Sequence, residues 1–213
     1  MTPGKIVCIG RNYAAHAREL GNAVSAEPVL FLKPPSSVIE GGATIVLPRA
    51  SERVEHEAEI GVVIARRVRH ASETEARAAI GGITCVNDVT ARDLQKSDVQ
   101  WTRAKGFDTF CPVGPRVMPV DGATFDFAAL EVWCRVNGQE RQHGRARDMA
   151  FNIPFLVAYI SRVMTLEPGD LLATGTPEGV GPLVHGDVVE VEVSGVGVLR
   201  NSVAAAGNEE GAR

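Results

Sequence analysis

The chain has 213 residues, of which 45% are hydrophobic and 23% charged, and this composition is typical of a soluble globular domain. Its formal net charge is −4 and it contains no basic block, which argues against nucleic acid as a partner. No apolar run is long enough to span a membrane, no signal peptide precedes Lys5, and the four scattered cysteines form no C-x-x-C pair. We therefore expect a cytoplasmic protein with reduced cysteines, bound neither to membrane nor to nucleic acid.

The N-terminal part predicts strands at 5–9 and 29–32 with a helix at 14–20 between them. On that helix His16 and Glu19 are three residues apart, so their side chains share a face. A carboxylate bonded to one imidazole nitrogen prepares the other nitrogen to take a proton from water. An exposed surface ion pair explains the same spacing. Lys33, after the second strand, is a candidate for contacting an anionic ligand or simply marks the strand end.

An acidic strand is predicted over residues 54–66, where Glu55, Glu57 and Glu59 occupy alternate positions and therefore one face. The strand continues into the apolar run I-G-V-V-I, which indicates a core, and charges beside a core must be paired or bound to metal. An edge strand with a solvated acidic face is the alternative. Asp88 follows a buried strand at 83–86 and is a candidate third metal ligand.

The remaining elements are mostly strands and turns, because glycine (22 residues) and proline (12) are abundant. A Ser72–Glu75 capping box predicts a helix at 73–80, and Pro154 suits the first turn of a helix at 153–164. The other expected features are a helical turn from Thr90, a rigid apolar loop at 111–115, hairpin turns at 137–138 and 194–195, and a disordered tail at 204–213.

Six segments in this order resemble the fumarylacetoacetate hydrolase superfamily, and most closely its small acylpyruvase-type members that consist of the catalytic domain alone. The segments are G-R-N-Y-A-A-H (10–16), F-L-K-P (31–34), H-E-A-E-I-G (56–61), N-D-V-T-A-R-D (87–93), K-G-F-D (105–108) and T-G-T-P-E-G-V-G (174–181). The resemblance covers nearly the whole chain. It implies an α+β, mainly β fold, a mixed β-sandwich roll with short flanking helices. We expect one catalytic domain at 1–203, with residues 11–26 as a lid segment.

The resemblance further implies a divalent metal held by Glu57, Glu59 and Asp88, usually Mg²⁺ and sometimes Mn²⁺ or Ca²⁺. Three oxygen ligands leave positions for water and substrate, which suits a hard cation. Glu55 falls outside the motif. Three carboxylates and one dication sum to −1, and Lys105, which matches the family's active-site lysine, would neutralise that charge and favour an incoming keto acid. A homodimer is expected by the same resemblance.

The implied reaction is cleavage of a C–C bond in a 2,4-dioxo acid such as an acylpyruvate or fumarylpyruvate, giving pyruvate and a carboxylic acid. His16, oriented by Glu19, would deprotonate a water, and Lys105 would stabilise the developing negative charge. The candidate substrate-binding residues are Arg11, Tyr13, Lys33, Gln95 and Thr176.

Two alternatives stay open. The same site supports isomerisation or decarboxylation of hydroxymuconate-type acids and decarboxylation of oxaloacetate, as in the catabolism of aromatic compounds or keto acids. The His16–Glu19 pair favours the hydrolase because water activation needs a base. A non-catalytic ligand-binding β protein is the third hypothesis, but it gives no reason for the acidic residues, the lysine and the histidine pair to occur together.

Overall fold

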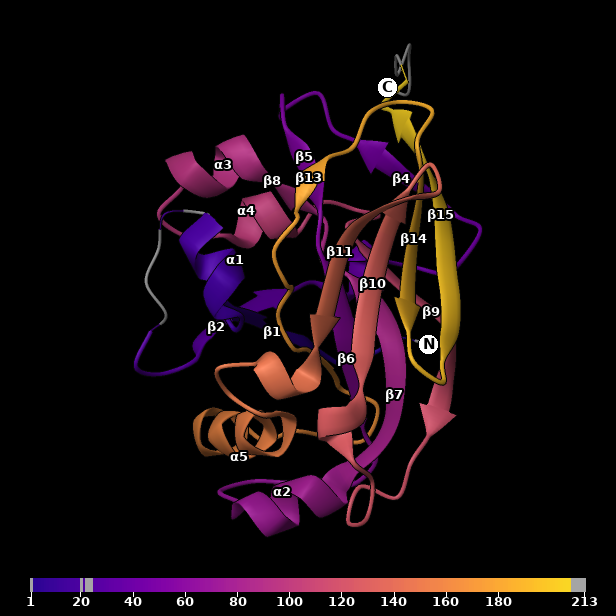
Figure 1. Cartoon of the computed structure of the whole chain (residues 1–213). Helices are drawn as coiled ribbons and strands as arrows, with labels where there is room; N and C mark the ends of the chain where they lie inside the picture. The colour runs from indigo at the N-terminus through magenta and orange to yellow at the C-terminus, as the bar shows by residue number, and fades with distance from the viewer. Residues whose placement is uncertain (1, 20, 22–24, 208–213) are drawn as a thin grey trace.

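The computed structural model describes residues 2–19, 21 and 25–207. Within these residues a mixed seven-stranded sheet runs through the middle of the molecule (Figure 1). In spatial order its strands are β2 (Val29–Lys33), β1 (Ile6–Gly10), β12 (Leu171–Ala173), β6 (Ala58–Ile64), β7 (Ile80–Asn87), β9 (Cys111–Pro119) and β3 (Val38–Ile39).

Two smaller sheets complete the roll in the described part of the chain. The five-stranded sheet contains β11 (Gln139–Arg145), β10 (Glu131–Val136), β14 (Val188–Val193), β15 (Gly197–Ala205) and β4 (Thr44–Leu47). The three-stranded sheet contains β13 (Gly181–Pro182), β5 (Val54–His56) and β8 (Thr90–Ala91). This architecture confirms the predicted mainly β fold.

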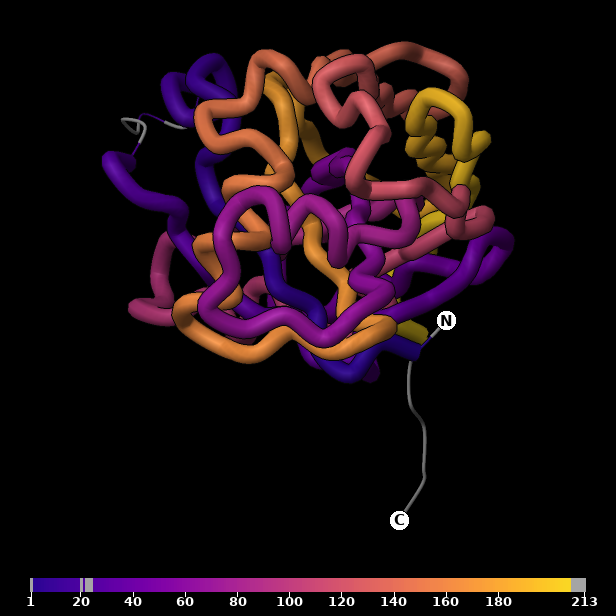
Figure 2. Tube along the Cα trace, turned by 90° about the horizontal axis from the view of Figure 1, so that it is seen from below, coloured from indigo at the N-terminus to yellow at the C-terminus, as the bar shows by residue number. Residues whose placement is uncertain are grey.

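The helices are short and lie around the sheets (Figure 1). They are α1 (Ala14–Glu19), α2 (Glu73–Ala79), α3 (Arg92–Ser97), α4 (Thr102–Lys105) and α5 (Ile153–Val163), with single 3₁₀ turns at Pro35–Ser37, Phe127–Ala129 and Ala146–Asp148. Figures 1 and 2 both place α1 and the β14–β15 hairpin on opposite sides of the molecule. No helix in the described ranges is long and apolar enough to cross a membrane.

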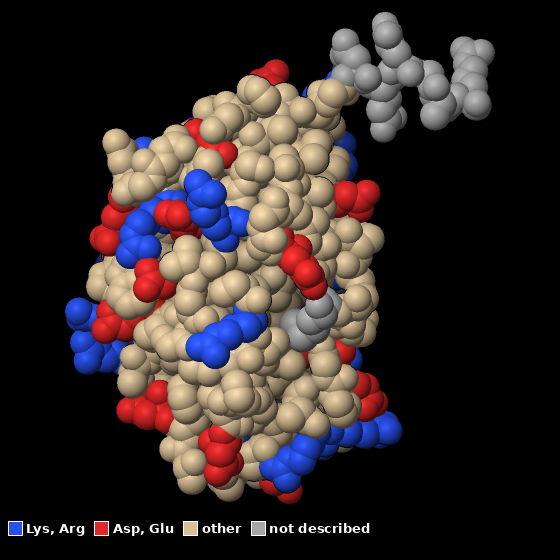
Figure 3. Space-filling view, turned by 90° about the vertical axis from the view of Figure 1, so that its right-hand side faces the viewer, with Lys and Arg blue, Asp and Glu red and all other residues tan. Residues whose placement is uncertain are grey.

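The main core lies between the seven-stranded and the five-stranded sheets. Residues of β10 and β14 alternate between buried and half-buried positions, so each strand turns one face to the core. Their valines pack against the buried residues of β6 and β7. All four cysteines are free and buried. Figure 3, which looks at the side carrying β9 and β15, shows acidic and basic side chains intermixed, without a continuous basic area.

Three predicted elements differ from the structure. Residues 111–115 are not a loop but the start of β9, which pairs with β7 and β3. The helical turn expected from Thr90 begins at Arg92, because Thr90 and Ala91 pair with β5. β15 continues to Ala205 and pairs with β4, so residues 204 and 205 are strand and not tail. Of the rest of the predicted tail, Ala206 N donates to Leu47 O over 3.0 Å, and residues 208–213 lie outside the described residues.

Helix α5 begins with an asparagine cap that offers a test of local stability. Asn152 Oδ1 accepts a hydrogen bond of 2.9 Å from Phe155 N, and proline stands in the first turn as predicted. Replacing Asn152 by alanine leaves that backbone donor without its partner, so we expect the free energy of unfolding to fall by about 1 kcal/mol. Urea denaturation measures the change. Asn152→Asp keeps an acceptor and should stay close to the parent; equal losses in both variants would contradict the assigned role of the cap.

Candidate active site

The acidic strand is broken at Glu57. β5 ends at His56 and β6 begins at Ala58, so the single strand predicted over 54–66 is wrong in its continuity. At the break Glu57 N donates to Asn87 Oδ1 over 3.0 Å, and Glu57 O accepts from Asp88 N over 2.8 Å. These bonds bring Glu57 beside the end of β7, directly where Asp88 follows that strand.

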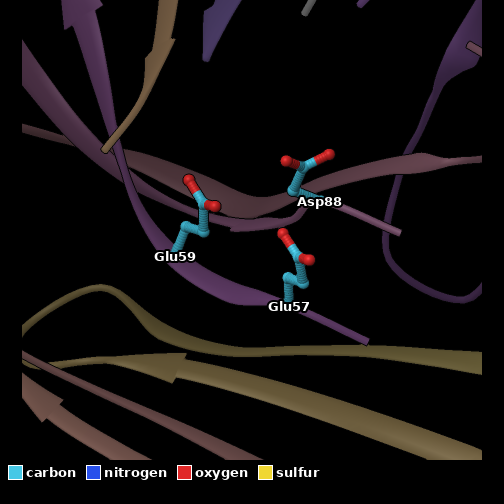
Figure 4. Close-up of side chains that lie close together, drawn as sticks. All are labelled: Glu57, Glu59 and Asp88. Atoms are coloured by element: carbon cyan, nitrogen blue, oxygen red, sulfur yellow. The ribbon is translucent and has the colours of Figure 1, made fainter. Parts of the chain in front are cut away.

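Three carboxylates meet at this point (Figure 4). Glu57, Glu59 and Asp88 each offer an oxygen within 4.8 Å of the others, and the three residues are 5%, 1% and 0% exposed. This burial excludes a solvated acidic face. Carboxylate oxygens that converge in this way are the ligands that Mg²⁺, Mn²⁺ and Ca²⁺ prefer, so the donor set fits the predicted divalent metal.

Of the three carboxylates, Glu59 has the fewest partners that stabilise its negative charge. Its Oε2 accepts a hydrogen bond of 2.7 Å from Gly175 N, and it forms no ion pair with any described residue. Gly175 has φ +97°, and a Cβ there would lie 2.7 Å from the Asn12 Cβ, so the turn needs glycine. Burial raises the pKa of Glu59 well above its usual range, and the Asp88 and Glu57 carboxylates raise it further. A bound cation would stabilise the ionised form of this side chain.

Two lysines and an arginine neutralise the other two carboxylates. Lys105 Nζ lies 2.8 Å from Glu57 Oε2 and 2.7 Å from Asp88 Oδ2, and Lys33 Nζ lies 2.6 Å from Asp88 Oδ1. Arg92 bonds Glu57 Oε1 over 2.6 Å and Glu55 Oε2 over 2.7 Å. Burial disfavours the ionised form of Glu57, but Lys105 and Arg92 outweigh it and lower the pKa of that carboxyl. Burial likewise opposes the charge of Lys105, but Asp88 and Glu57 raise its pKa.

The net charge of the site therefore differs from the one counted on the sequence, which included only the three carboxylates, a dication and Lys105. The acidic groups are Glu55 and the three candidate ligands, and the buried cations are Lys33, Arg92 and Lys105. Four negative and three positive charges sum to −1, and a bound dication would make the sum +1. A site of that charge attracts an anionic substrate.

A cavity of about 540 Å³ opens beside the carboxylates. It is lined by residues from the N-terminal segment, the acidic strand and helices α3 and α4: Gly10, Arg11, His16, Glu19, Phe31, Arg53, Glu55, Glu57, Arg92, Gln95, Lys96, Trp101, Lys105 and Val180. Six predicted site residues thus share one cavity, namely Arg11, His16, Glu19, Glu57, Gln95 and Lys105. Arg11 adopts φ +61° and has no hydrogen-bond or ion-pair partner among the described residues.

The predicted histidine pair is formed. His16 Nδ1 lies 3.3 Å from Glu19 Oε2; His16 is 4% exposed, whereas Glu19 is exposed to solvent. Glu19 also accepts from Gly179 N over 3.1 Å, which joins helix α1 to the turn after β12. The predicted lid segment 11–26 includes residues 20 and 22–24, which lie outside the described residues.

Three predicted substrate-binding residues do not line the cavity. Lys33 is bonded to Asp88 and to Val89 O. Tyr13 is 3% exposed, and its hydroxyl has no hydrogen-bond partner among the described residues. Thr176 donates to Ala58 O over 2.9 Å and accepts from Gln142 Nε2 over 2.7 Å. Their roles toward a substrate stay predictions.

Sequence reasoning missed Arg92 as a site residue. Its buried guanidinium reaches Glu55, Glu57 and Gln95, and so joins helix α3 to the acidic strand. The available signal was its position four residues after Asp88 in the N-D-V-T-A-R-D segment, but the sequence places it only on a helical turn. Glu55 was left outside the metal motif, and the structure explains it as the partner of Arg92 and Arg53.

The chain is similar to known proteins over nearly its whole length. Residues 5–204 match the model of the fumarylacetoacetate (FAA) hydrolase C-terminal family. The chain is 46% identical over 206 residues to a protein of Arabidopsis thaliana named oxaloacetate tautomerase FAHD1, mitochondrial, covering 93% of this chain and 90% of that protein. It is 44% identical over 200 residues to a Dictyostelium discoideum protein named oxaloacetate decarboxylase, mitochondrial, covering 92% of this chain and 91% of that protein.

A solved structure is similar over almost the whole fold. It is described as 5-carboxymethyl-2-hydroxymuconate delta-isomerase from Mycobacterium smegmatis, with 44% identity and a TM-score of 0.89, and the match covers 98% of this chain and 81% of that one. The match to the family model, the identity to these relatives and the shared fold lead to one conclusion. The chain belongs to the fumarylacetoacetate hydrolase family.

Proposed function

We propose that this chain is a divalent-metal-dependent enzyme that moves a proton in a 2-oxo dicarboxylic acid, with keto–enol tautomerisation or decarboxylation of oxaloacetate as its reaction. The observation that carries the proposal is the buried convergence of Glu57, Glu59 and Asp88 beside a cavity that also contains Lys105 and His16. The names of the two relatives and of the solved structure support the choice of reaction, because tautomerisation, decarboxylation and isomerisation of such acids all pass through an enol.

Glu57, Glu59 and Asp88 would hold the metal. A divalent cation supplies Lewis-acid polarisation of the keto oxygen and so makes the neighbouring carbon more acidic. Lys105, fixed between two carboxylates and facing the cavity, places positive charge where the enol oxygen gains negative charge. Arg11, with no partner among the described residues, is available to bind a substrate carboxylate bidentately.

His16 is the group assigned to proton transfer. It is the single histidine among the described residues that line the cavity, and imidazole exchanges protons readily near neutral pH. Glu19 holds Nδ1, which leaves Nε2 for the substrate. In tautomerisation the proton moves between C3 and the 2-oxygen. In decarboxylation the C3–C4 bond breaks, CO₂ leaves, and C3 takes a proton to give pyruvate.

Hydrolysis of an acylpyruvate is the second candidate. The observation that favours it is the same His16–Glu19 pair, because such a pair can also take a proton from water. The two candidates differ in their substrates. A panel of oxaloacetate, 5-carboxymethyl-2-hydroxymuconate, acetylpyruvate and fumarylpyruvate with added Mg²⁺ tests the choice. We expect turnover of oxaloacetate and of 5-carboxymethyl-2-hydroxymuconate, and turnover of the two acylpyruvates alone would overturn the leading proposal.

Replacing His16 by glutamine separates the reactions further. We expect tautomerisation of oxaloacetate to fall by roughly 10²–10⁴-fold, the usual contribution of an acid–base group. Decarboxylation should fall less, because loss of CO₂ needs no base to remove a carbon-bound proton. Absorbance of the enol measures the first reaction and pyruvate formation the second.

Two controls accompany this variant. His70→Gln changes a histidine that is exposed and does not line the cavity, and it should behave as the parent chain. Glu19→Gln keeps a hydrogen-bond acceptor near His16 but removes the charge, and it should show a smaller loss in the same direction. Unchanged tautomerisation in His16→Gln, together with lost hydrolysis of acetylpyruvate, would assign the hydrolase function instead.

A further inference from the structure

Gln142 is an unusual residue for its position. Strand β11 is exposed at most of its residues, and Gln142, at 1% exposure, is one of its two buried positions. Opposite it the β10–β11 register shifts, so that Cys134 pairs with Gln142 and Arg135 with Glu140, leaving Arg141 unmatched. Such a bulge redirects neighbouring side chains, and here an amide enters the protein where an apolar residue would ordinarily pack.

The amide of Gln142 uses its full hydrogen-bonding capacity. Its Oε1 accepts from Ala58 N over 3.1 Å and lies 3.0 Å from His56 Nδ1. Its Nε2 donates to Thr176 Oγ1 over 2.7 Å and to Pro177 O over 2.8 Å. The orientation of the amide is fixed by these partners, because Ala58 N can only donate and Pro177 O can only accept.

These four contacts join the segment that carries the candidate ligands Glu57 and Glu59 to a turn that binds the Glu59 carboxylate. On one side are His56 and Ala58, the residues that flank Glu57 at the break between β5 and β6. On the other side is the turn after β12, where Gly175 N binds Glu59 Oε2. Thr176 also links the two segments directly, since it accepts a hydrogen bond from Gln142 and donates one to Ala58 O.

We propose that Gln142 is a positioning residue for the metal site: its amide fixes Glu57 and Glu59 relative to each other without touching either carboxylate. The break in the acidic strand leaves Glu57 outside the ladders in which both of its neighbours pair, and the Gln142 amide contacts both of these neighbours. Groups that orient the ligands of a metal contribute strongly to its affinity although they do not coordinate it. This inference rests on the proposed metal-dependent function.

The test is a matched pair of variants on the same strand. Gln142→Met removes all four contacts at similar volume, and Gln139→Met changes an exposed glutamine whose Oε1 accepts only from Arg141 among the described residues. Calorimetric titration with Mn²⁺ gives the dissociation constant, and thermal unfolding with chelator gives the stability of the metal-free protein. We expect Gln142→Met to raise the dissociation constant about 10–100-fold, with kcat largely restored at saturating Mn²⁺, and Gln139→Met to match the parent.

The other possible results distinguish failure of the proposed function from failure of the positioning role alone. If the parent chain binds no Mn²⁺, the proposed function itself fails. If the parent binds Mn²⁺ and Gln142→Met binds it as tightly, only the positioning role is overturned, even where the metal-free protein has become less stable. If Gln142→Met does not fold, Thr176→Val decides, because it removes one contact of Gln142 and one of Ala58. A weaker Mn²⁺ affinity in that variant supports the proposal, and an unchanged affinity overturns it.

Discussion

Replacing Asp88 by asparagine should remove both the bound divalent metal and turnover. The substitution keeps the volume but takes away one of three charged ligands and leaves Lys33 and Lys105 without their shared partner. Loss of groups that merely orient ligands already costs about 10–100-fold in metal affinity, so we expect a loss of at least about 100-fold from a direct ligand. Metal content after dialysis and the rate with oxaloacetate at fixed Mg²⁺ measure the two effects.

Asp170→Asn is the matched control. Asp170 is also buried, at 1% exposure, and accepts hydrogen bonds from Glu167 N over 2.7 Å and from Lys5 N over 3.1 Å, but it lies outside the site. This variant should lose stability and keep its metal. If Asp88→Asn retains stoichiometric metal and parental turnover, or if both variants lose metal equally, the assignment of Asp88 as a ligand is wrong.

Replacing Lys105 by methionine should lower kcat by roughly 10²–10³-fold at saturating metal, the usual effect of removing one group that stabilises developing negative charge. The ammonium is fixed by Glu57 and Asp88 and faces the cavity, so its charge is in place before the substrate binds. Loss of one partner of a buried ion pair typically costs about 3–5 kcal/mol, so circular dichroism must first establish that the variant is folded at the assay temperature.

Lys33 provides the comparison for Lys105. Both lysines are buried and each bonds one oxygen of Asp88, but only Lys105 lines the cavity. Lys33→Met should therefore weaken metal binding and stability while kcat at saturating metal falls much less than in Lys105→Met. Equal losses of kcat in the two variants would mean that Lys105 acts only through Asp88 and not on the substrate.

The sequence predicted the elements that depend on local signals. The capping box at Ser72 and Glu75 begins α2, and Pro154 stands in the first turn of α5, because these patterns act within a few residues. The convergence of Glu57, Glu59 and Asp88 was predicted from the family resemblance, because the E-x-E spacing alone also allowed a solvated acidic face.

The failures concern features that depend on distant parts of the chain. At the break, Glu57 N and Ala58 N donate to the side-chain oxygens of Asn87 and Gln142, which lie 30 and 84 positions away. Residues 111–115 contain two prolines and a glycine, which locally favour a loop, yet they join β9 because β3 and β7 lie on either side. The roles of Arg92 and Gln142 are set by which carboxylates and turns the fold brings to them.

Whether the three carboxylates hold a metal beside the substrate can be seen by anomalous diffraction from crystals soaked in Mn²⁺ together with oxalate, an inert mimic of a 2-oxo acid. We expect one Mn²⁺ peak at coordination distance from oxygens of Glu57, Glu59 and Asp88, with oxalate on the cavity side near Lys105. A Mn²⁺ peak elsewhere, or three carboxylates that hold only water under these conditions, would contradict it.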